Sequence, residues 1–187
     1  MLNYNTLSKD ELNHNGLSIR EISPIMKLNL RGKKREFFTT VGKNLNMILP
    51  TEANTSTTSD KLTAIWLSPD EWMIVSNELV NKDTNKYELY EILFNSISKT
   101  NLGAVIDVTD QFVQLELKGK NIYKIFSAGC PFNFNEFKEK IGATTQTVLN
   151  HIDVILHHKE ENVVNLFARR SFAEHLWSWI EDSASRL

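Results

Sequence analysis

Cysteine is nearly absent from this sequence, since Cys130 is the only one among 187 residues. A single thiol excludes an intrachain disulfide and a zinc site made of several thiolates, and it fits a reducing compartment. The polar residues 1–15 lack the apolar segment of a signal peptide. No apolar run reaches the ~18 residues that a membrane span needs. We therefore expect a cytoplasmic protein that has no contact with a membrane.

An excess of basic charge is missing as well. The chain has 21 Lys and Arg against 23 Asp and Glu, which gives a formal net charge of −2. The densest basic run, Arg31 to Arg35, contains Gly32 and is interpreted as a solvated turn. Because nucleic acids are bound mainly by cationic surfaces that neutralise their phosphates, we expect no nucleic acid as a partner.

Glycine is scarce too, and the spacing of the seven glycines excludes several kinds of site. They form neither the Gly-x-Gly-x-x-Gly fingerprint of dinucleotide binding nor a phosphate-binding Walker loop. A Gly-x-Ser-x-Gly elbow is also missing, and the serines fall in turns and caps. We expect the chain to bind no NAD or FAD by itself and to hold no activated nucleophile.

Three histidines are the first candidates for a metal site: His151, His157 and His158. In a strand, His151 and His157 point to the same face but lie ~20 Å apart, whereas His157 and His158 point to opposite faces. This spacing favours exposed histidines at strand ends over metal ligands. We expect no metal in this chain.

Asp107, Asp110 and Cys130 are the remaining candidates for chemistry. The two aspartates flank a turn, where acids that bond to nearby amides are far commoner than acid/base pairs. Cys130 follows Gly129 at an expected helix end, with no fixed cation beside it to activate the thiol, so a buried and inert sulfur is favoured. No residue is assigned a catalytic role.

Hydrophobic periodicity divides the first half of the chain into strands and helices. Residues 1–16 are expected to form a flexible N-terminal arm, and the polar segment Thr51–Lys61 a mobile surface loop. A strand is expected from Ile25, with Lys27 and Asn29 on its polar face, followed by helix Glu36–Leu45 and a hairpin of Ala64–Leu67 and Trp72–Val75. A second helix is expected over Thr84–Ser98, with Thr84 or Asn85 as its cap and an apolar stripe of Leu89, Ile92, Leu93 and Ile97. Strand Ala104–Asp107 follows this helix.

The second half begins with a strand over residues 113–117. Its polar residues, Gln114 and Glu116, alternate with apolar ones and are expected on a wet face. We expect this strand to pair with Ala104–Asp107 across the Thr109-Asp110 turn.

A short helix over residues 122–126 follows, and Gly129 can end it in the left-handed conformation. The asparagine-rich loop after it places Phe132, Phe134 and Phe137 close together. Rings so close in irregular chain plug either a core or an interface, and we favour the core.

Three further strands are predicted at Thr147–Leu149, Ile152–Leu156 and Val163–Ala168. The chain then closes with an amphipathic helix, for which Ser171 and Glu174 form the pattern of a capping box. The order of elements predicts an α+β fold of two ferredoxin-like split β-α-β halves, with mainly antiparallel sheets and helices packed on them. We expect one compact unit, residues 17–187, with lobes of about 17–107 and 108–187.

Five residues are candidates for an interface: Trp72, Arg169, Arg170, Trp177 and Trp179. Trp177 and Trp179 lie at the rims of the apolar arc of the last helix, where an aromatic ring can contact both core and partner. Arg169 and Arg170 can clamp a carboxylate or form interface ion pairs, and an alternative is that one caps local acids while the other is solvated.

Three motifs resemble those of the gamma subunits of heterotetrameric sarcosine oxidase. They are Trp66–Trp72 (Trp-Leu-Ser-Pro-Asp-Glu-Trp), Gly129–Pro131 (Gly-Cys-Pro), and Ala168–Ala173 (Ala-Arg-Arg-Ser-Phe-Ala) with the tryptophans that follow. The likeness runs from about Leu17 to Asp182. It implies a fold akin to the folate-binding region of glycine-cleavage aminomethyltransferases, to which Gly103–Leu117 is similar.

The resemblance further implies membership in a complex that demethylates sarcosine to glycine with folate-linked one-carbon transfer. The partners it implies are alpha- and beta-type flavoprotein subunits and a delta zinc subunit, and FAD, FMN, NAD and zinc would be held by those partners. This chain is then a non-catalytic structural subunit without a cofactor, able to self-associate when isolated. The alternatives are a stand-alone protein that binds reduced folate, or a subunit of a related N-methyl amino acid dehydrogenase.

Overall fold

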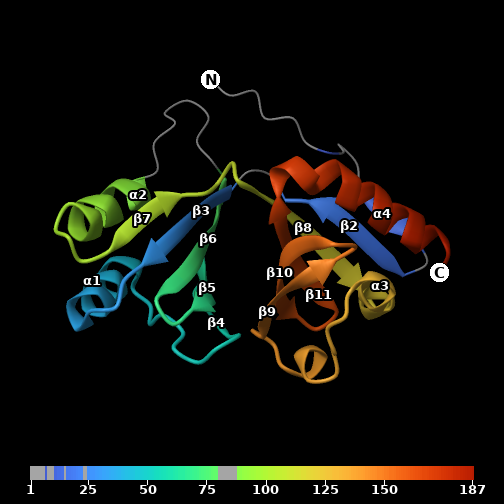
Figure 1. Cartoon of the computed structure of the whole chain (residues 1–187), viewed down its shortest axis with the longest axis horizontal. Helices are drawn as coiled ribbons and strands as arrows, with labels where there is room; N and C mark the ends of the chain where they lie inside the picture. Colours follow the sequence, from blue (N-terminus) through green and yellow to red (C-terminus); the bar gives the residue numbers. More distant parts are fainter. Residues whose placement is uncertain (1–6, 8–10, 15, 23–24, 80–87) are drawn as a thin grey trace. The chain divides into compact units, whose positions relative to one another are not determined.

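The computed structural model describes residue 7 and residues 11–14, 16–22, 25–79 and 88–187, which form two compact units (Figure 1). One unit comprises residues 24–110, and the other combines residues 1–23 with 111–187. This division differs from the expected lobes because an N-terminal strand joins the second sheet. Most of the expected N-terminal arm lies outside the described residues, but Leu12–His14 form strand β1.

The unit of residues 24–110 is a five-stranded antiparallel sheet with helices on one face (Figure 1). Its strands are ordered β4-β5-β6-β3-β7, so β3, β5, β6 and β7 have the 4-1-3-2 order of a ferredoxin-like sheet and β4 adds an edge. Its elements are β3 (Ile25–Arg31), α1 (Arg35–Leu45), β4 (Ser56–Thr58), β5 (Leu62–Ser68), β6 (Glu71–Leu79), α2 (Glu88–Leu93), the π-helix η1 (Phe94–Ser98) and β7 (Ala104–Asp107).

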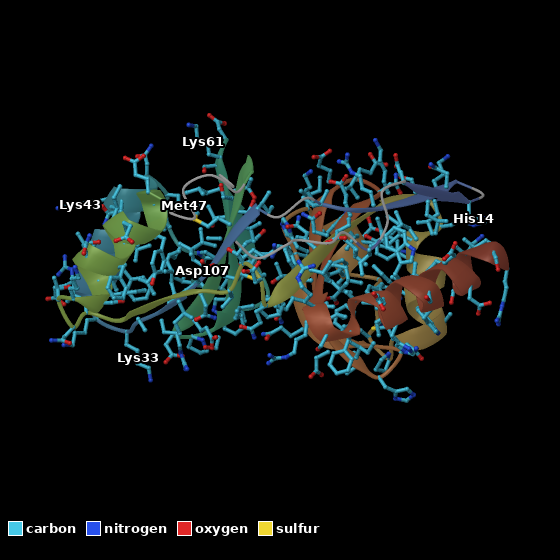
Figure 2. The ribbon with its side chains drawn as sticks, turned by 90° about the horizontal axis from the view of Figure 1, so that it is seen from above. His14, Lys33, Lys43, Met47, Lys61 and Asp107 are labelled. Atoms are coloured by element: carbon cyan, nitrogen blue, oxygen red, sulfur yellow. The ribbon has the colours of Figure 1, made fainter. Side chains whose placement is uncertain are left out.

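The core of this unit lies between the sheet and its helices. Phe37 and Val41 project from α1 at helical spacing onto the strand residues Leu28 and Leu30. Met47 follows the helix and lies between α1 and the strands (Figure 2). The predicted strand, helix and hairpin are therefore confirmed.

Three predictions for this unit are wrong. Lys27 is buried because β3 is flanked by β6 and β7, and its Nζ donates to the Ile25 carbonyl at 3.3 Å. The segment Thr51–Lys61 is not a loop throughout, since it contains β4. Ile92 is 43% exposed and falls outside the apolar stripe of α2. The proposed caps Thr84 and Asn85 lie outside the described residues.

The second unit is a six-stranded antiparallel sheet that α3 and α4 cover on one face (Figure 1). The strand order is β1-β2-β8-β11-β10-β9. Its elements are β1 (Leu12–His14), β2 (Leu17–Glu21), β8 (Phe112–Gly119), α3 (Ile122–Gly129), the 3-10 turn η2 (Phe137–Glu139), β9 (Thr144–Leu149), β10 (Ile152–Glu160), β11 (Val163–Arg169), the 3-10 turn η3 (Arg170–Phe172) and α4 (Ala173–Ser185).

The two units share one topology. Strands β2-β8-β11-β10 repeat the 4-1-3-2 order of β7-β3-β6-β5, and β9 occupies the edge position that β4 has in the other unit. The difference is that the fourth strand, β2, comes from the N-terminus instead of following α4. The prediction of two ferredoxin-like halves with antiparallel sheets is confirmed.

Strand β8 departs from two predictions. It does not pair with β7, because β7 is bonded to β3 in the other sheet. Gln114 and Glu116 are buried instead of wet. Glu116 accepts hydrogen bonds from Arg20 Nε at 2.8 Å and Lys159 Nζ at 3.1 Å, so the carboxylate keeps its charge inside the sheet.

Helix α3 ends at Gly129 as predicted, but the local structures predicted for the two helix ends of this unit do not form. Helix α4 follows η3, and the Ser171 side chain makes no cap, so the capping box does not form. Gly129 is not left-handed. By contrast, Phe134 and Phe137 are buried in the core as expected. Among the helices of the described residues, none is long and apolar enough to cross a membrane.

Candidate docking surfaces

Trp72 is a core residue and cannot serve as a docking residue. Its ring is 1% exposed, stacks on Phe37 at 5.9 Å and meets Phe38 edge-on at 5.4 Å. Its Nε1–H donates to the Pro50 carbonyl at 2.8 Å. The sequence pattern could not reveal this, because the strand is apolar on both sides of the ring.

The turn before Trp72 joins the hairpin to β3. Ser68 Oγ donates to Asp70 Oδ1 at 2.9 Å, and Asp70 lies near Lys33 at 3.4 Å and Arg31 at 3.7 Å. The hydrogen bond from Ser68 lowers the pKa of Asp70, and the two cations lower it further. Burial raises the pKa, but this effect is smaller than that of the Ser68 hydrogen bond. The Asp70 carbonyl also accepts the Gly32 N–H at 3.1 Å. The motif thus serves the fold of its own unit.

Arg169 and Arg170 have different roles. The Arg170 Nη1 lies 3.5 Å from Glu21 Oε1, and its backbone N–H donates to the Gln111 carbonyl at 2.9 Å. Because the Glu21 side chain is 1% exposed, this ion pair ties β2 to the end of β11 within one unit. Arg169 is exposed and forms no ion pair among the residues that the structure describes. The alternative of one capping and one solvated arginine is the one observed.

Trp177 and Trp179 are half-buried and pack against the core of the second unit. A side chain placed on Gly129 would come within 2.6 Å of the Trp179 ring, so this glycine is required by the close contact between α3 and α4. Both rings keep part of their surface outside the core, which leaves them as candidates for an interface.

A first groove, here called the sheet groove, crosses the ends of β8 to β11 and has a volume of about 510 Å³. Its lining includes the apolar side chains of Phe112, Ile155 and Phe167 and the charged side chains of Arg169 and Asp153. Both charged side chains are exposed, so water competes strongly for any ion that they bind.

A second groove, here called the α3 groove, lies between α3 and the loop that follows it and has a volume of about 640 Å³. Its lining includes Tyr123, Lys124, Phe132, Phe134 and Lys138. Sequence reasoning placed the phenylalanines in the core and overlooked the lysines. The sequence does show a lysine on either side of the aromatic cluster, which could have indicated a charged groove. The loop between the two lysines has no regular pattern, however, so their proximity could not be predicted.

The histidines form no metal site. Within the described residues there is no group of three or more His, Cys, Asp or Glu side chains that could hold a metal ion. His157 and His158 are buried, which corrects their expected exposure, while His151 is exposed. His158 Nδ1 bonds to the carbonyls of Phe137 at 3.0 Å and Lys140 at 2.9 Å and so fastens the phenylalanine loop to β10.

Asp107 and Cys130 have structural environments. Asp107 Oδ1 accepts the Thr109 N–H at 2.9 Å, as expected for an acid in a turn. The Cys130 thiol is buried, with its Sγ 3.5 Å from Thr147 Oγ1.

The two repeated units place this chain in a class of proteins built from paired ferredoxin-like halves. The motifs singled out in its sequence stabilise the halves in which they lie. Residues 32–186 match the sequence profile of the sarcosine oxidase, gamma subunit family, and the chain belongs to that family. The resemblance seen in the three motifs is confirmed.

Known relatives agree with this assignment. The gamma subunit of sarcosine oxidase from Corynebacterium sp. (strain U-96) is 25% identical over 121 residues, which are 65% of this chain and 55% of that protein. The chain therefore spans little more than half the length of this curated relative.

Two solved structures share the fold. One is a chain of heterotetrameric sarcosine oxidase from Corynebacterium sp. U-96 in complex with pyrrole 2-carboxylate, with a TM-score of 0.82 and 21% identity over 94% of this chain and 87% of that chain. The other is the glycine cleavage system aminomethyltransferase T from Bartonella henselae, with a TM-score of 0.60 and 15% identity over 89% of this chain and 46% of that chain.

Proposed function

We propose that this chain is a non-catalytic structural subunit of a heterotetrameric sarcosine oxidase. The match to the gamma-subunit family over residues 32–186 carries the proposal. The fold shared with a chain of the Corynebacterium enzyme supports it. In this proposal the complex demethylates sarcosine to glycine in the cytoplasm, with folate-linked one-carbon transfer.

The proposed partners are alpha- and beta-type flavoprotein subunits and a delta zinc subunit, which would hold the FAD, FMN, NAD and zinc. A structural role is supported by what the motif residues do. Trp72 and Arg170, which belong to two of the three motifs, are bonded within their own units: Trp72 donates to the Pro50 carbonyl, and Arg170 is paired with Glu21.

Co-expression with the alpha- and beta-type subunits of the same organism tests the proposal. We expect the chain to co-elute with them in size-exclusion chromatography at a fixed stoichiometry. Peroxide should form from sarcosine only in samples that contain the flavoprotein subunits. A chain that elutes alone, or that turns over sarcosine by itself, would show that the proposal is wrong.

The alternative of a stand-alone folate-binding protein has its own test. Titration calorimetry of the isolated chain with tetrahydrofolate should give no binding heat if the chain is only structural. A subunit of a related N-methyl amino acid dehydrogenase would instead assemble with flavoproteins that prefer another N-methyl substrate over sarcosine.

A further inference from the structure

We propose that the α3 groove is the docking site for an acidic segment of a partner subunit, which inserts an apolar side chain between Lys124 and Lys138. This inference rests on the proposed function, because it names the surface through which the subunit would bind its complex. It concerns only the unit that contains α3.

The charge of the groove selects the partner. Lys124 on α3 and Lys138 on the opposite loop are both exposed. Neither forms an ion pair with any residue that the structure describes, whereas Arg20, Lys33 and Arg170 are each paired with a carboxylate of their own unit. Two unpaired cations on one groove match a segment that supplies two carboxylates.

The floor of the groove supplies an apolar anchor point. Phe132 is half-buried and packs edge-on against Phe134 at 5.0 Å and Phe137 at 6.1 Å. The buried members of this cluster hold Phe132 in place, so its exposed part is a rigid aromatic surface. A rigid apolar centre with a charged rim is the arrangement typical of an anchor pocket in protein interfaces.

Tyr123 adds a hydrogen-bond donor without a partner. Its ring lines the groove, and its hydroxyl is buried and makes no hydrogen bond within the described part of the chain. Burial, together with the nearby charge of Glu139, raises the pKa of Tyr123 to about 12, so the phenol stays protonated at neutral pH. In this proposal the inserted segment displaces the groups that cover the hydroxyl, and one of its backbone carbonyls accepts the hydrogen bond; a carbonyl suits this position better than a carboxylate because Glu139 is close.

A peptide segment fits the groove better than a small anion. Both lysines are exposed, and exposed ammonium groups bind a free anion only weakly in water. A segment that combines an apolar anchor with two carboxylates gains from the aromatic floor and the rim at the same time. The volume of about 640 Å³ has room for an anchor side chain and its flanking backbone.

The deciding experiment measures the affinity of the full chain for the purified alpha- and beta-type subunits. The double charge reversal Lys124→Glu, Lys138→Glu should weaken binding by about tenfold or more, and the loss should shrink as salt is added. The matched control is Lys34→Glu, Lys43→Glu, which makes the same change of net charge at exposed positions of the other unit; Lys43 projects outward from α1 (Figure 2). The control should bind like the wild type.

A second variant, Tyr123→Phe, separates docking from folding. Because the hydroxyl has no hydrogen-bond partner among the residues that the structure describes, its removal should leave the melting temperature unchanged or higher. Binding to the partner subunits should nevertheless weaken about threefold to tenfold. Unchanged binding by Tyr123→Phe would contradict the hydrogen bond that we assign to the hydroxyl.

The outcomes distinguish this inference from the proposed function. If the wild type binds the partners and the double reversal binds equally well, only the inference is overturned. If the wild type does not bind at all, the proposed function fails. Binding of inorganic phosphate by the isolated chain, abolished by the double reversal, would assign the groove to a small anion. A dimer of the isolated chain that the double reversal dissociates would assign it to a second copy.

Discussion

His157 lies in the middle of a sheet, and this position disfavours protonation of its side chain. It lies on β10 opposite Asn165 on one side and Thr144 on the other, and it is 3% exposed. Burial, and to a lesser degree the positive charges of His158 and Lys159, lowers the pKa of His157 to about 4. The folded state therefore disfavours protonation of this side chain.

Stability should consequently depend on pH between about 4, the pKa of His157 in the folded chain, and about 6.5, the ordinary pKa of histidine. The unfolded chain takes up the proton near pH 6.5, so the contribution of His157 is present above this value and is lost as the pH falls. At about pH 5 we expect a loss of about 2 kcal/mol in the free energy of unfolding relative to pH 7. Urea denaturation of the wild type and His157→Gln tests this, because the variant should show a much flatter dependence. Parallel curves would contradict the assignment.

Single residues also show where periodicity stops being informative. Alternation correctly placed Leu28 and Leu30 on one face, but it assigned Lys27, Gln114 and Glu116 to solvent. A period of two says only that neighbouring side chains point to opposite faces, and an inner strand can be buried on both. The partners that make Glu116 tolerable, Arg20 and Lys159, are distant in sequence and could not be foreseen.

At the scale of elements, α3 and α4 approach each other closely at Gly129 and Trp179. Gly129 ends α3 directly beneath the ring of Trp179, at a distance that leaves no room for a side chain. The sequence predicts that α3 ends at Gly129, but the cause it suggests is the left-handed backbone conformation of glycine. The true reason, packing against a helix 50 residues later in the chain, needs the structure.

A double-mutant cycle tests this contact. Gly129→Ala should lower the free energy of unfolding by about 1–3 kcal/mol, because the new methyl group collides with the Trp179 ring. In a Trp179→Leu background the same substitution should cost much less, since the obstructing ring is gone. Additive effects of the two substitutions, measured by chemical denaturation, would show that the contact does not limit residue 129.

Strand β2 is the element whose role was least visible in the sequence. Leu17, Ile19 and Glu21 alternate with polar residues, which is compatible with a strand but does not say which sheet it joins. The structure pairs it with β8, and Arg170 holds Glu21 at its end. The motif that contains Arg170 is thus explained by a strand at the other end of the chain.

If β2 belongs to the core, Ile19→Ala should be costly. Ile19 is 1% exposed and packs in the core under α4, so we expect a loss of about 2–4 kcal/mol in the free energy of unfolding. Ser18→Ala, at the half-buried neighbouring position, is the control and should cost less than about 1 kcal/mol. Equal and small effects in thermal or urea unfolding would mean that β2 is a dispensable arm.

At the scale of the whole molecule, the two units differ in how the chain builds them. Residues 24–110 form one unit from a continuous segment, whereas the other unit needs both ends of the chain. The fold class could be predicted from the order of strands and helices. The division into lobes could not, because local patterns do not reveal that an early strand completes a late sheet.

A circular permutation tests this architecture. Residues 111–187 alone lack the strand in the β2 position and should fail to fold, as judged by circular dichroism and the absence of a cooperative melting transition. Fusing residues 1–23 behind residue 187 through a flexible linker of ~15 residues should restore a cooperative transition, since β2 then follows α4 as β7 follows η1. A cooperative transition in 111–187 without β2 would contradict the requirement.

The position of β2 also has a consequence for biosynthesis. When the ribosome has made this strand, its neighbour β8 is still roughly 90 residues away, which at ~5–20 residues per second means a delay of roughly 5–20 seconds. During that time Leu17 and Ile19 have no sheet to join, although the intervening unit can already close. Newly made chains thus expose an apolar N-terminal strand that chaperones can bind, and an affinity tag fused to the N-terminus would leave the ribosome together with that strand.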